Sequence, residues 1–164
     1  MYNDQRRDHA RRLVAELELP HPLTAATLHR HMEAIRGKKI IIRQASPRML
    51  EHGICGLWIE IAGEDFERIH HAPTTSFVHR QQFINHEFGH MILHHQKEVI
   101  PAERVALLAP LIPLDAIAYA LARTRFTDDQ EALAEAIGDR LALIMLHDAP
   151  AAASGPQTGF GRVL

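Results

Sequence analysis

The chain is predicted to fold as one α+β domain, with helices packed on one face of a small, mostly antiparallel sheet. Its 164 residues suit a single domain, and 46% hydrophobic with 23% charged residues is the balance of a globular protein. Apolar residues recur at helical spacing towards both ends of the chain, whereas the central stretch 38–71 alternates like β-strands. The predicted domain covers residues 1–148, and residues 149–164 are predicted to be a disordered tail because they have little to bury.

Two helices are predicted before the sheet. The first covers residues 4–18, and Pro20 and Pro22 end it because proline cannot continue a helix. Thr24 can cap the second helix by accepting a hydrogen bond from a backbone N–H of the first turn. Gly37 is a suitable stop for that helix, since glycine readily adopts the left-handed conformation of a C-terminal cap. Local signals therefore bound both helices.

Three strands are predicted in the central stretch, at 38–44, 54–62 and 66–71. Gly63-Glu64-Asp65 makes a turn between the second and third strands, and Ser46-Pro47 indicates a short helical turn between the first two. We expect the strand 66–71 to be a free edge of the sheet, with which an extended peptide could pair.

Three more helices are predicted after the sheet. Residues 76–95 carry apolar residues at three- and four-residue spacing, and Thr75 or Ser76 can cap their first turn. A second helix is expected over 115–123. The last helix, 127–147, begins with the capping box TDDQ, in which a threonine side chain and a glutamine side chain satisfy each other's backbone N–H groups.

The helix 76–95 contains the sequence HEFGH, an instance of the H-E-x-x-H motif. Residues four apart share one face of a helix, so His86 and His90 can present two imidazoles to one tetrahedral zinc ion. Glu87, beside the first histidine, can take a proton from a water molecule that the zinc activates. The motif therefore predicts a catalytic zinc site with His86 and His90 as ligands and Glu87 as the base.

A catalytic zinc ion needs a third protein ligand and an open position for water. His94 lies on the same face of the helix, but a rise of about 12 Å separates it from His86, which is too far for two bonds of about 2.0–2.1 Å. Glu131 and Glu135, one turn apart on a later helix, are the alternatives, and one could bind zinc while the other orients a histidine. Asp139 could take the orienting role if Glu135 were the ligand.

With these residues the chain resembles the ImmA/IrrE family of zinc metallo-endopeptidases, especially its short actinobacterial members. The resemblance covers roughly residues 38–146. Its segments are Gly53–Trp58, Thr75–Arg80 with the HEFGHMILHH that follows, and Arg123–Glu131 with the nearby Glu135. The later helix of the family has the pattern E-x-E-A-E/D/N, and related gluzincins use its first glutamate as third ligand. The resemblance therefore implies Glu131 as the third ligand and Glu135 as the supporting acid.

The resemblance also implies a compact zincin-like domain that uses Zn²⁺ to hydrolyse peptide bonds. Its expected role is regulatory cleavage of a protein partner, typically a helix-turn-helix transcriptional repressor encoded nearby. Leu133 departs from the family pattern, because it stands where the pattern has its middle glutamate. If that glutamate were the family's ligand, this chain would lack it. The alternative is then a regulatory binding module that keeps the zincin fold without turnover.

Composition and charge exclude several other classes of protein. A net charge of −2 with scattered Lys and Arg gives no basic surface for direct nucleic-acid binding. Cys55 is the only cysteine, which excludes a disulfide framework and a cysteine-rich zinc site. The most hydrophobic stretch, 105–122, is interrupted by Pro110, Pro113 and Asp115, and the charged N-terminus does not resemble a signal peptide. We therefore expect a cytoplasmic protein with no membrane segment.

Overall fold

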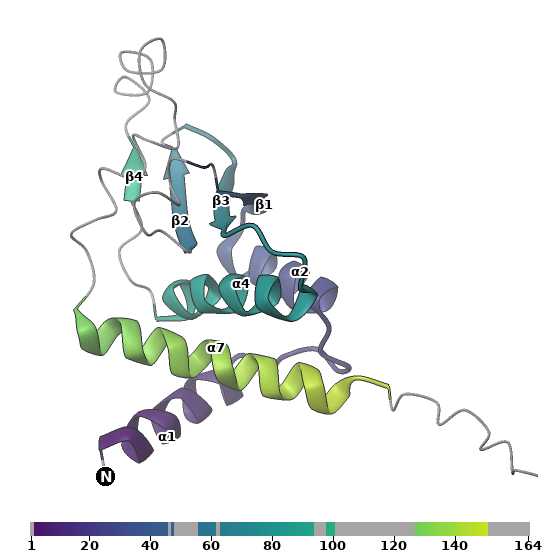
Figure 1. The fold of residues 1–164 in the computed structure, drawn as a ribbon, viewed down its shortest axis with the longest axis vertical. Helices are drawn as coiled ribbons and strands as arrows, with labels where there is room; N and C mark the ends of the chain where they lie inside the picture. The colour runs from purple at the N-terminus through teal and green to yellow at the C-terminus, as the bar shows by residue number, and fades with distance from the viewer. Residues whose placement is uncertain are drawn as a thin grey trace, which may run out of the picture.

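The computed structural model describes residues 2–45, 47, 56–61, 63–93, 98–100 and 127–150. Within these ranges the chain forms an α+β fold of four helices and four strands (Figure 1). In chain order they are α1 (Tyr2–Ala15), α2 (Ala25–Arg36), β1 (Lys39–Gln44), β2 (Gly56–Ile61), β3 (Phe66–His71), α4 (Phe77–Ile92), β4 (Glu98–Ile100) and α7 (Asp128–Asp148). None of the helices in these ranges is long and apolar enough to cross a membrane.

The four strands form one sheet in the order β1-β3-β2-β4. The hairpin β2–β3 is antiparallel, but β1 pairs with β3, and β2 with β4, in parallel. The prediction of a mostly antiparallel sheet is therefore wrong: two of its three pairings are parallel. The prediction that 66–71 is a free edge is also wrong, because β3 lies between β1 and β2. The alternation of apolar and polar side chains along a strand indicates which face of the sheet is buried. It is the same whether the strand pairs in a parallel or an antiparallel direction.

The predicted helix ends are confirmed where local capping determines them. The side chain of Thr24 accepts a hydrogen bond from the backbone N–H of Thr27, and Gly37 ends α2 with a φ of 65°. Ser76, not Thr75, caps α4. The capping box at Thr127 is present at the start of α7. The expected helix 115–123 and the tail residues 151–164 lie outside the described residues, as does Cys55.

The layers of the fold follow the apolar faces of its elements. In Figure 1 the sheet lies above α4, α7 lies below α4, and α1 packs against α7. One buried apolar core runs through these layers and takes residues from every one of them. Its members include Val14, Leu28, Met32, Ile40, Trp58, Ile69, Ile84, Phe88, Met91, Ile137 and Leu141. The core thus holds α4 between the sheet and α7.

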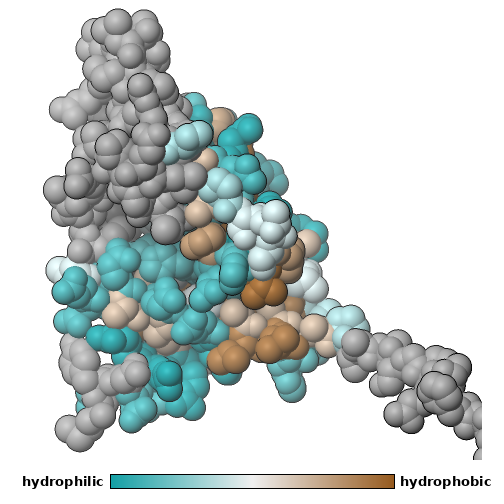
Figure 2. Space-filling model, viewed as in Figure 1, coloured by the Kyte–Doolittle hydropathy of each residue, from teal (hydrophilic) through white to brown (hydrophobic). Residues whose placement is uncertain are grey.

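Exposed apolar side chains gather where α4 begins and α7 ends. Phe77 and Val78 are 62% and 69% exposed, and Leu143 and Leu146 are 58% and 74% exposed. Figure 2 shows apolar surface over this end of the two helices, at the lower right of the view. The polar motif of α4 lies towards its other end, where α7 begins.

Candidate metal centre

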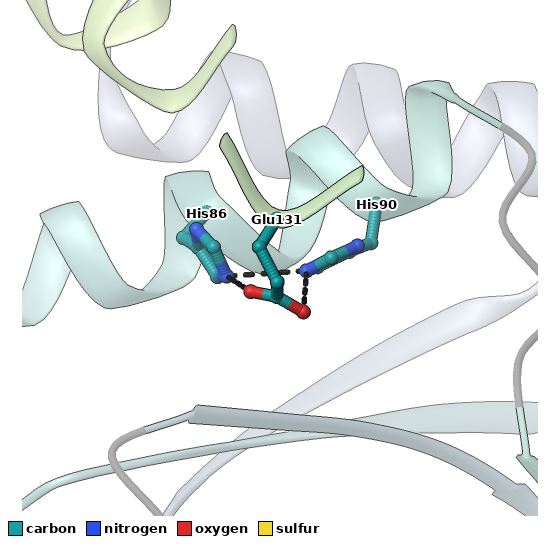
Figure 3. Close-up of side chains that lie close together, drawn as sticks. All are labelled: His86, His90 and Glu131. Atoms are coloured by element: carbon teal, nitrogen blue, oxygen red, sulfur yellow. Dashed lines mark hydrogen bonds and ion pairs between the residues drawn. The ribbon is translucent and has the colours of Figure 1, made fainter. Parts of the chain in front are cut away.

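Three of the residues predicted to form the site meet between α4 and α7. His86 and His90 project from α4, and Glu131 projects from the first turn of α7 (Figure 3). The Nε2 atoms of the two histidines are 3.1 Å apart. Glu131 places Oε2 3.3 Å from Nε2 of His86 and Oε1 3.6 Å from Nε2 of His90. This group could hold a metal ion, since one ligand atom from each residue lies within 4.8 Å of the others.

Local sequence explains why these three side chains point at one place. His86 and His90 are one turn apart in a helix that Ser76 begins and that no proline interrupts. Glu131 occurs in the first turn of α7 because the capping box at Thr127 fixes where that helix starts. The negative side chain is favourable there, since the N-terminal end of a helix carries partial positive charge.

The spacing of the three ligand atoms suits a small metal ion. Tetrahedral coordination with bonds of about 2.0–2.1 Å places neighbouring ligand atoms about 3.3 Å apart. The two Nε2 atoms are 3.1 Å apart, close to that value, and the two oxygens of Glu131 lie 3.3 Å from His86 and 3.6 Å from His90. Two imidazoles and one carboxylate are donors that suit zinc and several other transition metals. The residues present therefore fit the predicted metal by both donor type and spacing.

Glu135 takes the supporting position that the family resemblance implies for it. Its Oε2 lies 3.1 Å from Nδ1 of His86, on the opposite side of the ring from Glu131. Nδ1–H of His86 can donate to this carboxylate, which leaves the lone pair of Nε2 directed at the three-residue group. Asp139 is exposed one turn further along α7. Glu135 and Asp139 are not members of the metal-holding group.

Leu133 does not take part in the group either. Its side chain is half-buried and packs against the apolar core. Successive residues of a helix are rotated by about 100°, so a residue two positions after Glu131 faces away from the histidines. The departure from the family pattern at Leu133 therefore leaves the group of His86, His90 and Glu131 complete in this structure.

Glu87 is buried beside the group. Only 6% of it is exposed, and burial raises the pKa of its carboxyl from 4.5 to about 8. The negative charge of Glu131 raises this pKa as well. Positive charge held at the group would act in the opposite direction and favour the carboxylate. The carboxyl of Glu87 is thus sensitive to whatever charge the three ligands hold.

The site is closed on one side and open on the other. The side chain of His90 is only 3% exposed, whereas 45% of the Glu131 side chain is exposed. His86 lies between these limits, with 24% of its side chain exposed. A ligand or water molecule can therefore approach from the side of Glu131, while the core closes the side of His90.

Two glycines at the contact between α4 and α7 were not recognised in the sequence as parts of the site. A Cβ atom added at Gly89 would lie 2.5 Å from the carbonyl oxygen of Ala134. A Cβ atom added at Gly138 would lie 3.2 Å from the backbone nitrogen of His86. The sequence does indicate that these glycines are unusual, because each stands inside a predicted helix, where glycine costs about 1 kcal/mol relative to alanine.

Among the described residues, two further polar side chains, His71 and Arg80, are not members of the group. His71 is buried, and its Nδ1 lies 2.8 Å from the carbonyl oxygen of Ala72. Arg80 is exposed in the first half of α4. His94 and Arg123 lie outside the described residues.

Comparisons with known proteins identify no relative. No protein-family model, no curated protein and no solved structure matches this chain. The resemblance to the ImmA/IrrE family therefore rests on the sequence segments quoted above and stays a prediction.

Proposed function

We propose that this protein is a zinc-dependent metallo-endopeptidase with a zincin-like fold, similar to the ImmA/IrrE family. One observation carries the proposal: both histidines of an H-E-x-x-H helix and a glutamate from a second helix bring their ligand atoms within 4.8 Å of one another. A buried glutamate follows the first histidine, as hydrolysis by an activated water requires. A structural zinc site normally has four protein ligands, whereas the described part of the chain brings three to this group and leaves Glu131 partly exposed.

Each residue has a distinct role in the proposed reaction. His86, His90 and Glu131 would hold the metal ion, and Glu135 would keep His86 in the tautomer that leaves Nε2 free to bind. Zinc, when bound, lowers the pKa of a water molecule and polarises a carbonyl oxygen. Glu87 would take the proton from the attacking water and then deliver it to the departing amine nitrogen.

The pKa of Glu87 supports this assignment. Burial raises the pKa of its carboxyl to about 8, well above the usual range of a glutamate. Without a metal ion this favours the protonated carboxyl at neutral pH, and positive charge bound at the group would return Glu87 to the carboxylate that a base requires. Glu87 can therefore act first as a base and then as an acid near neutral pH.

The partner class comes from the resemblance alone. A regulatory protease of this family would cleave a helix-turn-helix repressor encoded nearby. The alternative, a zincin-fold module that binds such a partner without cleaving it, needs the same fold but not Glu87. The two proposals therefore differ in their predictions for the loss of the Glu87 carboxyl. The protease should lose cleavage of its partner, whereas binding by the module should be unchanged.

Glu87→Gln in the zinc-loaded full chain tests the proposal. Wild type and variant would be incubated with a defined peptide library and with the nearest encoded helix-turn-helix protein, and the products analysed by mass spectrometry. We expect Glu87→Gln to retain one zinc ion per chain and to lose hydrolysis by about 10²–10⁴-fold, the usual effect of removing a general base. Glu16→Gln, at an exposed position just after α1, is the matched control and should cleave like wild type.

Equal cleavage by wild type and Glu87→Gln would contradict the protease proposal. Binding of the helix-turn-helix protein by both chains, with cleavage by neither, would favour the binding module instead.

A further inference from the structure

The backbones of α4 and α7 touch at Gly89. A Cβ atom there would lie 2.5 Å from the carbonyl oxygen of Ala134 and 3.0 Å from its Cα. The atoms in the way are backbone atoms of α7, so no side-chain rotation could relieve the overlap. The absence of a side chain at position 89 therefore decides how closely α7 can lie on α4.

A second contact of the same kind lies one turn away and reverses the roles of the helices. Gly138 of α7 faces the backbone of α4, where an added Cβ would lie 3.2 Å from the nitrogen of His86 and 3.3 Å from the carbonyl oxygen of Asn85. This contact is tight but less severe than the one at Gly89. The helices run antiparallel, so the two contacts fix both their separation and their register.

The proposed metal ligands lie immediately beside these contacts. His90 follows Gly89 in α4, and the backbone of His86 itself faces Gly138. On α7, Glu131 is three residues before the Ala134 carbonyl that meets Gly89. No ligand is more than about one helical turn from a backbone contact. A change in the distance between the two helices should therefore displace the ligand atoms by a similar amount.

We propose that Gly89 and Gly138 are positioning residues of the metal centre, which hold the carboxylate of Glu131 at bonding distance from the same ion as both histidines. This inference rests on the metal site of the proposed function. Both contacts of Glu131 with the histidines, 3.3 Å from Oε2 to His86 and 3.6 Å from Oε1 to His90, cross from one helix to the other. Tetrahedral coordination requires about 3.3 Å, so an outward shift of α7 would move the Glu131 carboxylate away from an ion held by both histidines.

A role in packing alone makes a different prediction. If the glycines only allow the core to pack closely, another core substitution that lowers the free energy of unfolding by the same amount should weaken Zn²⁺ binding by the same amount. If they set ligand spacing, Gly89→Ala should disturb the metal more than such a change does. The more severe contact should also have the larger effect, so Gly89→Ala should exceed Gly138→Ala.

Metal binding by the full chain tests this inference without any substrate. Zn²⁺ affinity would be measured by competition with a chromophoric chelator, and the visible absorption of bound Co²⁺ would report coordination geometry. We expect Gly89→Ala to weaken Zn²⁺ binding by about 10–100-fold, the range found when groups that orient metal ligands are changed, and to alter the Co²⁺ spectrum. Gly138→Ala should cause a smaller loss in the same direction.

Ile137→Val is the matched control, because it removes buried volume from α7 without pushing the helices apart. It should lower the melting temperature and leave Zn²⁺ affinity and the Co²⁺ spectrum near those of wild type. Wild-type affinity and spectrum in Gly89→Ala would overturn the inference, as would an equal loss in Ile137→Val. If Gly89→Ala does not fold, Gly138→Ala decides by the same criteria. A wild-type chain that binds no metal would instead defeat the proposed function, and this inference with it.

Discussion

Two clusters of polar side chains lie within this fold, and they differ in how donors and acceptors are balanced. In the first, the fully buried carboxylate of Glu67 on β3 accepts a hydrogen bond of 2.8 Å from Arg36 of α2. It also accepts one of 2.9 Å from the indole N–H of Trp58 on β2. The guanidinium of Arg36 lies over the Trp58 ring, 5.0 Å from its centre. Every partner named here donates to the carboxylate, so this cluster is balanced.

The second cluster, at His86, His90 and Glu131, has the opposite character. Oε2 of Glu135 lies 3.1 Å from Nδ1 of His86 and Oε2 of Glu131 lies 3.3 Å from its Nε2, so two carboxyl groups flank one imidazole. Glu87, a further carboxyl, is buried beside them. Three carboxyl groups therefore gather around two imidazoles here, and a metal ion would supply positive charge to them. The comparison separates a buried carboxylate that has its arginine partner from a group of carboxyls whose balancing charge, under the proposed function, would be a metal ion.

The largest expected effect is on protein stability, at the cluster of Glu67, Arg36 and Trp58. Arg36→Ala should lower the free energy of unfolding by about 3–5 kcal/mol, because it leaves the buried carboxylate of Glu67 without its positive partner. Urea denaturation of the metal-free protein measures this. Arg30→Ala, at an exposed position of the same helix, should change stability by no more than about 0.5 kcal/mol. A loss in Arg36→Ala as small as that of the control would mean that the two clusters do not differ in this way.

The next effect concerns the stability that a bound metal ion adds at the second cluster. Zn²⁺ at about 100 times its dissociation constant should raise the free energy of unfolding of wild type by about 2.7 kcal/mol. His90→Ala should lose this gain, since it removes one of three ligands, whereas His79→Ala, exposed in the first turn of α4, should keep it. Thermal denaturation with added Zn²⁺ or with a chelator provides the measurement. An undiminished gain in His90→Ala would show that zinc binds elsewhere.

The third effect, the smallest when taken for one pH unit, concerns pH in the metal-free protein. The pKa of Glu87 rises from 4.5 to about 8 on folding, so the folded state holds a proton that the unfolded state releases. This contribution to stability is complete below pH 4.5 and is lost as pH rises towards 8, by up to about 1.4 kcal/mol for each pH unit. Glu87→Gln, which cannot ionise, should lack this loss. Superimposable stability profiles of the two proteins across this range would contradict the assignment.

Capping and helical spacing were predictable because they depend on neighbours in sequence. Thr24, Ser76 and Thr127 each accept a backbone N–H three residues ahead, and Gly37 adopts a left-handed conformation. The pairing of His86 with His90 on one face follows from the helical repeat in the same way. These features could be predicted without knowing what packs against the helix.

Strand neighbours and helix separation could not be predicted in this way. The interior place of β3 depends on which strands reach its two edges, and alternation of its side chains does not report that. The residue patterns left Glu131 and Glu135 as alternatives, since both border the same apolar stripe. Their positions follow from how α7 lies on α4, with Glu131 facing both histidines and Glu135 reaching only Nδ1 of His86.

The sequence by itself therefore determined the helices, their caps and the two histidines with the glutamate between them, because local backbone geometry governs all of these. The tertiary structure alone decided the order of the sheet and the convergence of Glu131 on the histidines. The reason is physical: the distance between two helices is set by the atoms at their contact, here the missing side chains of Gly89 and Gly138. Those contacts join residues 45 to 53 positions apart in the chain (89 to 134, and 85 or 86 to 138), beyond the reach of any local pattern.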